Sequence, residues 1–450
     1  MNKEGTIFGH PKGLFVLFFT ELWERFSFYG MRAILVLYLT AEVGANNPGL
    51  GWDNASALEL YGWYTMMVYL MSIPGGLIAD RLLGQKKSVL VGGILIAIGQ
   101  FTLAVDDLIA FYSGLALIVT GVGMLKPNIS TMVGGLYRSG DSRRDAGFTI
   151  FYIGINIGAL AAPLLVGYYG EVIDWHLGFS LAGFGMILGQ IVYVFGWKYL
   201  KGVGGLLKHS ETEKHLANAP LTKVDKDRLV VMFISFAIVM VFWAAYEQAG
   251  GLMNLFAKEK VDRVLFGWEI PASFFQSMHA FYVVLLGVPM AWLWNRWRKM
   301  GFESSSPFKM AIGSIIMSLG FVVLMGAAWQ VLESASGMAS VYWLLGAYLL
   351  HVVAELSISP VALSFITKLA PARYASFMMG TYFAVTGLGN KLAGMLGEAA
   401  QSAGELAVFT GIAIFCFIFG ILLLFLIKKL KTMAHGAEDE TDMEALVEPE

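Results

Sequence analysis

Residues 75–87 read Gly-Gly-Leu-Ile-Ala-Asp-Arg-Leu-Leu-Gly-Gln-Lys-Lys, and this stretch says most about the fold. The small residues at its start allow two helix backbones to approach closely in a lipid bilayer. The pair Asp80-Arg81 follows, where an apolar helix has to end. Lys86 and Lys87 come next, and basic residues mark the cytoplasmic side of a membrane. The stretch therefore predicts a short cytoplasmic loop between two membrane-spanning helices.

The composition of the whole chain is that of a polytopic membrane protein. Of its 450 residues, 57% are hydrophobic and only 14% charged, and the mean hydropathy is +0.65. A soluble protein carries roughly a quarter charged residues. Apolar runs of about 20 residues, long enough to span a bilayer as a helix, recur along the chain. We predict twelve spans, near residues 14–40, 59–79, 88–105, 109–136, 146–170, 177–199, 229–257, 274–295, 308–331, 338–367, 375–398 and 406–427.

The distribution of basic residues predicts the orientation of these spans. With the N-terminus inside, the inner loops and the central linker hold most of the lysines and arginines, whereas the outer loops hold only Lys258, Lys260 and Arg263. Because basic residues favour the cytoplasmic side, both termini are expected in the cytoplasm of a cell that carries this protein in its plasma membrane.

A polar, basic segment at residues 200–228 divides the chain into six spans plus six. Two similar halves around a central site are typical of secondary transporters. Residues 75–87 also resemble the loop signature of the major facilitator superfamily. The resemblance implies an all-α membrane protein with two six-helix bundles, at 1–199 and 229–430. The linker 200–228 joins them, and an acidic tail at 431–450 is expected to be disordered.

Eight charged residues lie well inside the predicted spans, away from the span ends. A charge at the centre of a bilayer costs roughly 2.5–3.5 kcal/mol, so such residues are rare and usually functional. The set is balanced, with acids and bases in equal number: Glu21, Glu24, Arg25, Arg32, Lys126, Glu247, Glu355 and Lys391. This balance predicts ion pairs that face a polar cavity, through which protons or a charged substrate would be transported.

The first span gathers its charges on one face. At about 100° per residue, Glu21, Glu24, Arg25, Tyr29 and Arg32 fall within an arc of roughly 140°. One alternative is that pairs such as Glu21–Arg25 merely neutralise one another within the helix. For Lys126 in the fourth span, the alternative is a lysine that extends its ammonium to the membrane surface.

Two later spans also carry polar residues at helical spacing. In the seventh span one face holds Trp243, Glu247, Gly250 and Asn254, and in the tenth one face holds His351, Glu355 and Ser359. His351 is expected either to bond to Glu355 or to serve as a packing histidine.

Depth in the bilayer predicts which charges pair across the two halves. Arg32 and Glu247 each lie about 18 residues from the inner end of their spans. At 1.5 Å per residue in a helix, this places them at similar depth in the outer half of the bilayer. Lys126 and Glu355 each lie about 17 residues from the outer end of their spans, which by the same rise per residue places both in the inner half. We therefore predict two gating pairs, Arg32–Glu247 outside and Lys126–Glu355 inside. Making one pair while breaking the other would give alternating access, and a proton on either glutamate would release its partner.

Several motifs resemble those of one transporter family. Residues 21–30, Glu-x-x-Glu-Arg-Phe-x-Phe-Tyr-Gly, closely resemble the E-x-x-E-R-F-x-Y-Y-G motif of proton-dependent oligopeptide transporters. Further matches are Leu125-Lys-Pro-Asn128, Phe151-Tyr-x-x-Ile-Asn-x-Gly158, Phe242-Trp-x-x-x-Glu-Gln248 and Glu355-Leu-x-x-Ser-Pro360.

This resemblance implies a proton-coupled symporter that imports di- and tripeptides. By position, Arg25 and Lys126 would hold the peptide carboxylate, and Glu355 with Asn156 the amino terminus. The other residues expected to contact the peptide are Tyr29, Tyr69, Tyr152, Trp243, His279 and Ser359. The glutamates expected to be linked to the proton are Glu21, Glu24 and Glu247.

The sequence departs from the family pattern at a few positions. His279 stands where the family usually has an asparagine that helps to hold the amine. A neutral histidine could accept the same hydrogen bond, whereas a protonated one would repel the amine. Tyr382 replaces a common tryptophan, and Phe28 replaces the first tyrosine of the motif.

These departures leave a second transport hypothesis open, in which the cargo is another zwitterion, an organic anion or a drug. An enzyme is not expected, because the sequence lacks the H-E-x-x-H and G-x-S-x-G motifs and a phosphate loop. We expect no cofactor other than the coupling proton, no metal site and no nucleic-acid partner. The sequence makes no prediction about a protein partner.

Overall fold

The computed structural model describes residues 6–137, 141, 143–206, 222–370 and 375–437. Most of the predicted linker (207–221) and of the acidic tail (438–450) lies outside these residues. The described residues fall into two compact units, one within Met1–Lys208 and Gln248–Val284 and the other within His209–Glu247 and Leu285–Glu450. The division into bundles at the linker stays a prediction.

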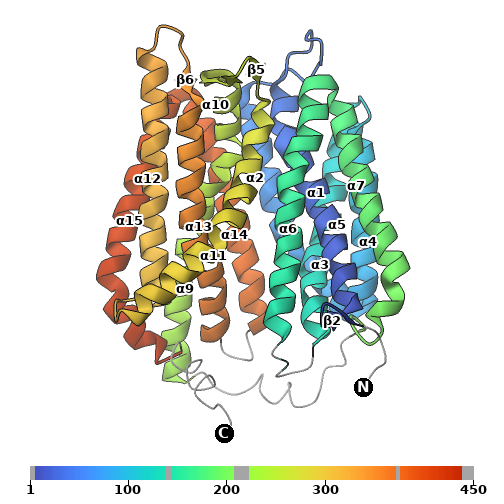
Figure 1. Cartoon of the computed structure of the whole chain (residues 1–450), viewed down its shortest axis with the longest axis vertical. Coiled ribbons are helices and arrows are strands. Elements are labelled where there is room, and N and C mark those ends of the chain that lie inside the picture. The colour runs from blue at the N-terminus through green and yellow to red at the C-terminus, as the bar shows by residue number, and fades with distance from the viewer. Residues whose placement is uncertain (1–5, 138–140, 142, 207–221, 371–374, 438–450) are drawn as a thin grey trace. The chain divides into compact units, whose positions relative to one another are not determined.

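The first unit contains the helices of the N-terminal half and the outer parts of two later spans (Figure 1). Its α-helices are α1 (Lys12–Thr40), α2 (Asn54–Leu70), α3 (Ser72–Ile78), α4 (Gln85–Leu103), α5 (Leu108–Gly135), α6 (Arg143–Gly167), α7 (Trp175–Gly196), α10 (Leu252–Lys260) and residues 275–284 of α11 (Phe275–Lys299). Short π-helical turns at Ala79–Leu83 and Tyr168–Ile173 extend two of them, and 3-10 turns cover Trp197–Leu200 and Ala272–Phe274.

The second unit is built from the inner parts of those two spans and the last four. It contains α9 (Lys223–Tyr246), residues 285–299 of α11, α12 (Ser306–Glu333), α13 (Val341–Leu369), α14 (Ala375–Ala403) and α15 (Glu405–Ala434). The only described strands are two residues long. β1 (Thr6–Ile7) pairs antiparallel with β2 (His10–Pro11), and β4 (Val264–Leu265) with β5 (Trp268–Glu269); β3 (Val261–Asp262) and β6 (Ala339–Ser340) complete the set.

Ten of the described helical segments are long and apolar enough to cross a membrane. The other two predicted spans correspond to α1, which carries four of the buried charges, and to α14, which carries Lys391 and Glu398.

Side chains fix several helix starts as the sequence requires. Asp53, Asp107 and Asp174 each accept a hydrogen bond from the backbone N–H three residues later, at 2.9, 2.8 and 2.7 Å.

Residues 75–87 end the second span as predicted. Asp80 and Arg81 lie in the π-helical turn that closes it, and Gly84 follows with a φ of 76°, which favours glycine. A Cβ at Gly75 would clash with the backbone carbonyl of Gly123 on α5, so the small residues do bring two helices together.

The seventh span is broken, and one prediction about it is therefore wrong. The sequence placed Trp243, Glu247, Gly250 and Asn254 on one face of a continuous helix. Instead α9 ends at Tyr246, a 3-10 turn covers Glu247–Ala249, and α10 begins at Leu252. Gly250 and Gly251 occupy the break, where two glycines in a row weaken a helix. Asn254 lies beyond the break and donates a hydrogen bond to the carbonyl of Ala33, at 3.0 Å.

Two boundaries also differ from the expected ones. The helix of the seventh span begins at Lys223 rather than near residue 229, because Thr222 and Asp225 form a reciprocal capping box at its start. The last helix continues to Ala434, beyond the expected bundle end at residue 430.

Candidate functional site

The predicted charged face of α1 carries a buried ion cluster in the first unit. Arg25 Nε lies 3.1 Å from Glu21 Oε1 and is also paired with Glu24 Oε2. All three side chains are buried, and Glu24 is fully inaccessible. The intrahelical Glu21–Arg25 pair, which the sequence left as an alternative, is therefore present. Buried charges of this kind need partners, because an unpaired one would be very costly.

Aromatic rings surround the basic side chains of the same helix. The Arg25 guanidinium carbon lies 5.6 Å from the ring centre of Phe28 and 5.8 Å from that of Tyr29. The Arg32 guanidinium carbon lies 5.5 Å from the same Tyr29 ring centre. A cation within about 6 Å of a ring centre is attracted by the ring electrons. Tyr29 thus links the two arginines along one face of α1.

Lys126 on α5 belongs to the same cluster. Its ammonium lies 4.1 Å from the ring centre of Tyr69 on α2, and it interacts electrostatically with Arg25, Tyr29 and both glutamates. The first unit therefore holds Glu21 and Glu24 with Arg25, Arg32 and Lys126, two negative and three positive charges, which leaves an excess of one positive charge. Such an excess suits an anionic group such as a carboxylate.

Two glycines bring the helices of this cluster close together. A Cβ at Gly158 on α6 would clash with the carbonyl of Leu22 and would approach the Cβ of Arg25 to 3.0 Å. A Cβ at Gly123 on α5 would approach the carbonyl of Met71 to 2.5 Å, one turn before Lys126. The glycines of the family-like motifs thus act by packing, which sets the position of the charged residues beside them.

The other predicted residues of the first unit lie on α6 and α11. Asn156 is buried and donates its amide to the carbonyl of Tyr152, at 2.9 Å, whereas the Tyr152 side chain is 46% exposed. His279 is half-buried on the part of α11 that belongs to this unit. The hydroxyl of Ser277 donates to the carbonyl of Leu160, at 2.9 Å, so this part of α11 packs on α6.

Two tyrosines of α2 were not recognised from the sequence. Tyr64 is buried and interacts electrostatically with Glu24 and Arg32. Its hydroxyl has no hydrogen-bond partner among the described residues. Tyr61 lies beside Gly250, where an added Cβ would clash with the Tyr61 hydroxyl and approach Arg32 Nε to 2.9 Å. Two phenols one turn apart in a predicted membrane span were the signal available in the sequence.

The second unit places an acid beside an aromatic group. The hydroxyl of Tyr246 donates to Glu355 Oε2, at 3.1 Å, and thereby joins α9 to α13. The Tyr246 ring stacks on Phe242 at 5.2 Å and meets Trp243 edge-on at 5.3 Å. Tyr246 was not predicted as a site residue. Ser359 is half-buried one turn beyond Glu355 on α13.

His351 packs against α12. Its ring centre lies 4.8 Å from that of Phe321, and a Cβ at Gly320 would clash with its ring. This geometry favours the packing interpretation of the histidine. Glu247 is buried at the first residue of the 3-10 turn, at the edge of the second unit.

The two predicted gating pairs join residues of different units. Arg32 and Lys126 belong to the first unit, whereas Glu247 and Glu355 belong to the second. Both pairings stay predictions. Among the described residues, no cluster of three or more histidine, cysteine or acidic side chains could hold a metal ion.

Comparison with known proteins gives one family. The model of the POT family matches residues 86–210 and 206–410. The di-/tripeptide transporter of Lactococcus lactis (strain IL1403) is 35% identical, and the alignment covers 95% of this chain and 97% of that one. The peptide transporter YePEPT of Yersinia enterocolitica (strain YE-P4) is 36% identical over 87% of this chain and 88% of its own length.

A solved structure agrees with the predicted fold. A variant of a peptide transporter POT, crystallised in complex with alafosfalin, superposes with a TM-score of 0.88 at 34% identity, over 96% of this chain and 97% of that one. The expected class, an all-helical membrane protein with the major facilitator fold, is thereby confirmed.

Proposed function

We infer that this chain, which belongs to the POT family of membrane transporters, imports di- and tripeptides together with protons across the plasma membrane. The observation that carries the proposal is the positively charged cluster of the first unit, in which Arg25 and Lys126 lie among aromatic rings. A guanidinium and an ammonium are the natural partners of a peptide carboxylate. The homologous structure with bound alafosfalin supports a peptide-like ligand.

The amino terminus of the peptide is assigned to Glu355 of the second unit, with Asn156 and His279 of the first. Glu355 accepts a hydrogen bond from the Tyr246 hydroxyl, and a carboxylate is a natural partner of an ammonium group. Asn156 and His279 would help to hold the amine, and Trp243 with Ser359 would line the space for side chains. Tyr29, Tyr69 and Tyr152 would contact the peptide backbone.

Proton coupling is assigned to Glu21, Glu24 and Glu247. The two glutamates of α1 compete for one guanidinium, so protonation of either would leave the other paired with Arg25. Protonation of Glu247 would release Arg32, and protonation of Glu355 would release Lys126. Alternation between these two pairs is the proposed route to alternating access.

Uptake by proteoliposomes tests this function. Labelled dipeptide should accumulate when an inward proton gradient is imposed and should not accumulate without it. Absence of dipeptide uptake, with gradient-driven movement of another zwitterion, an organic anion or a drug, would favour the second transport hypothesis.

A single substitution tests the coupling. Glu247→Gln should abolish gradient-driven accumulation and preserve the exchange of internal for external peptide, because binding remains while the proton site is lost. The matched control is Glu398→Gln, an exposed acid of α14, which should behave as the parent protein. Unchanged accumulation in the Glu247 variant would refute the coupling role.

A further inference from the structure

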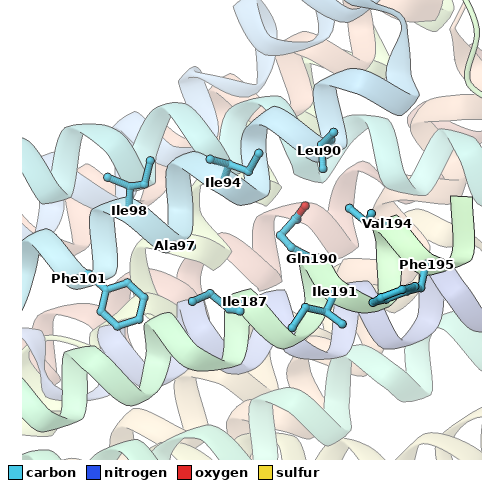
Figure 2. A pocket seen from close by; sticks show the side chains of 10 residues that line it. All are labelled: Leu90, Ile94, Ala97, Ile98, Phe101, Ile187, Gln190, Ile191, Val194 and Phe195. Carbon is cyan, nitrogen blue, oxygen red and sulfur yellow. The ribbon is translucent and has the colours of Figure 1, made fainter.

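A groove of about 440 Å³ runs between α4 and α7 in the first unit (Figure 2). Its walls are apolar side chains from both helices, among them Leu90, Ile94, Ile98, Ile187, Ile191 and Phe195. It is separate from the charged cluster on α1. The two helices pack against each other along the groove.

The outer edges of the groove are open. Ile98 is 50% exposed, Val194 52% and Phe195 77%. In a membrane-spanning helix, exposed apolar side chains meet lipid rather than water. From Leu90 to Phe101 the groove follows α4 for about 16 Å, at 1.5 Å per residue. One leaflet of the hydrocarbon core is about 15 Å thick, so the groove matches the depth of a single leaflet.

The only polar residue of the groove does not offer a polar surface. Gln190 lies between the two helices in Figure 2, is 9% exposed, and keeps both amide heteroatoms inaccessible. A Cβ at Gly93 would clash with Gln190 Nε2, so the amide packs against the α4 backbone. The accessible wall is therefore hydrocarbon, which suits an acyl chain and disfavours a peptide or a sugar.

The end of the groove near Leu90 and Phe195 carries four lysines. Lys86 donates to the carbonyl of Trp197 at 3.2 Å, and its ammonium lies 4.3 Å from the Trp197 ring centre. Lys201 is close enough to Lys86 to repel it, and Lys87 and Lys198 are exposed. Neither segment 82–105 nor segment 175–206 contains an acid. Basic residues beside a tryptophan at a helix end are typical of the cytoplasmic membrane surface.

We propose that this groove and its lysines form a binding site for an anionic phospholipid of the cytoplasmic leaflet. One acyl chain would lie between α4 and α7, and the phosphate would be held by Lys86, Lys87, Lys198 and Lys201. An anion there would also relieve the repulsion between Lys86 and Lys201. The charge of the headgroup selects the lipid, because the groove itself accepts any acyl chain.

Native mass spectrometry of the purified transporter tests the site. Phosphatidylglycerol and phosphatidylcholine with the same acyl chains are added in turn, and the fraction of protein that retains one lipid is measured. The parent protein should retain phosphatidylglycerol in preference. The double variant K198Q/K201Q should bind it at least about tenfold more weakly, because each lysine near the membrane surface contributes to anionic-lipid binding.

Matched variants separate a site from general attraction. K428Q/K429Q removes two exposed lysines from the cytoplasmic end of α15 and should leave retention unchanged. Ile98→Trp fills the groove and should reduce retention, whereas Ile414→Trp, in an apolar hollow lined by α15 alone, should not. Equal retention of the two lipids would overturn the proposal, as would equal losses in the α4–α7 and α15 variants.

Discussion

The two units hold their buried polar groups in different ways. In the first unit, Arg25 is paired with two glutamates, and the charges largely satisfy one another. In the second unit, Glu355 accepts a hydrogen bond from the neutral hydroxyl of Tyr246. Loss of one member of a buried ion cluster leaves another charge buried without that partner, whereas loss of a neutral hydroxyl removes a hydrogen bond and no charge. The first unit should therefore respond to mutation through both stability and transport, and the second mainly through affinity.

Removal of the central arginine should have the largest effect. Arg25→Ala leaves Glu21 and Glu24 buried without their cation, and loss of one partner of a buried pair costs about 3–5 kcal/mol. We expect a strongly lowered melting temperature and no dipeptide uptake. The control is Arg143→Ala, which breaks an exposed pair with Asp141 and should change the melting temperature little. Equal stability of the two variants would show that the buried cluster contributes no more to folding than an exposed pair of the same unit.

Removal of the Tyr246 hydroxyl should act mainly on affinity. Tyr246→Phe deletes a hydrogen bond to a charged group, a contribution of about 1.5–3 kcal/mol, so the KM for dipeptide should change by roughly tenfold or more. The melting temperature should stay near that of the parent. Tyr342→Phe, at an exposed tyrosine of the same helix α13 as Glu355, is the matched control. If Tyr246→Phe lost as much stability as Arg25→Ala, the expected difference between the two units in their response to mutation would be contradicted.

Substitution of the unusual histidine should have a smaller effect. His279→Asn restores the family residue and keeps a hydrogen-bond acceptor for the amine. We expect a lower KM for dipeptide, by roughly threefold, within the range of one hydrogen bond of about 0.5–1.5 kcal/mol. Uptake measured over a series of dipeptide concentrations gives this value. A higher KM would mean that the histidine itself is the better amine partner in this chain.

The smallest effect is expected at a peripheral ion pair of the second unit. Partial burial raises the pKa of Glu303, but hydrogen bonds from Lys431 and from Ser305 outweigh it and hold the pKa at about 2, below the ordinary 4.5. A lowered pKa stabilises the folded state above pH 4.5, and this contribution is lost as the pH falls from 4.5 towards 2. The parent protein should therefore lose its stability advantage over Glu303→Gln across that range. A constant difference in melting temperature would contradict the assignment.

Much of this architecture follows from the sequence because it depends on local pattern. Apolar runs, capping residues such as Asp53 and the glycines of residues 75–87 determine the spans and their ends. The break after Tyr246 was missed because apolar residues continue at helical spacing through Gly250 and Gly251.

The charged cluster was predictable because charge is rare in a membrane span, so Glu21, Arg25 and Lys126 stand out in the sequence. Tyr64 and Tyr246 do not, since tyrosine is also common as a packing or interface residue. Only the fold shows that their hydroxyls lie near charges.

The broken seventh span has a mechanical consequence. Outside residues 207–221, the backbone passes between the two units only at Glu247–Gln248 and at Val284–Leu285. The first of these positions lies in the 3-10 turn, shortly before Gly250 and Gly251, and the second lies inside the continuous helix α11. Because glycines in a row weaken a helix, we expect the backbone beside Glu247 to change conformation more readily than that of α11 at Val284.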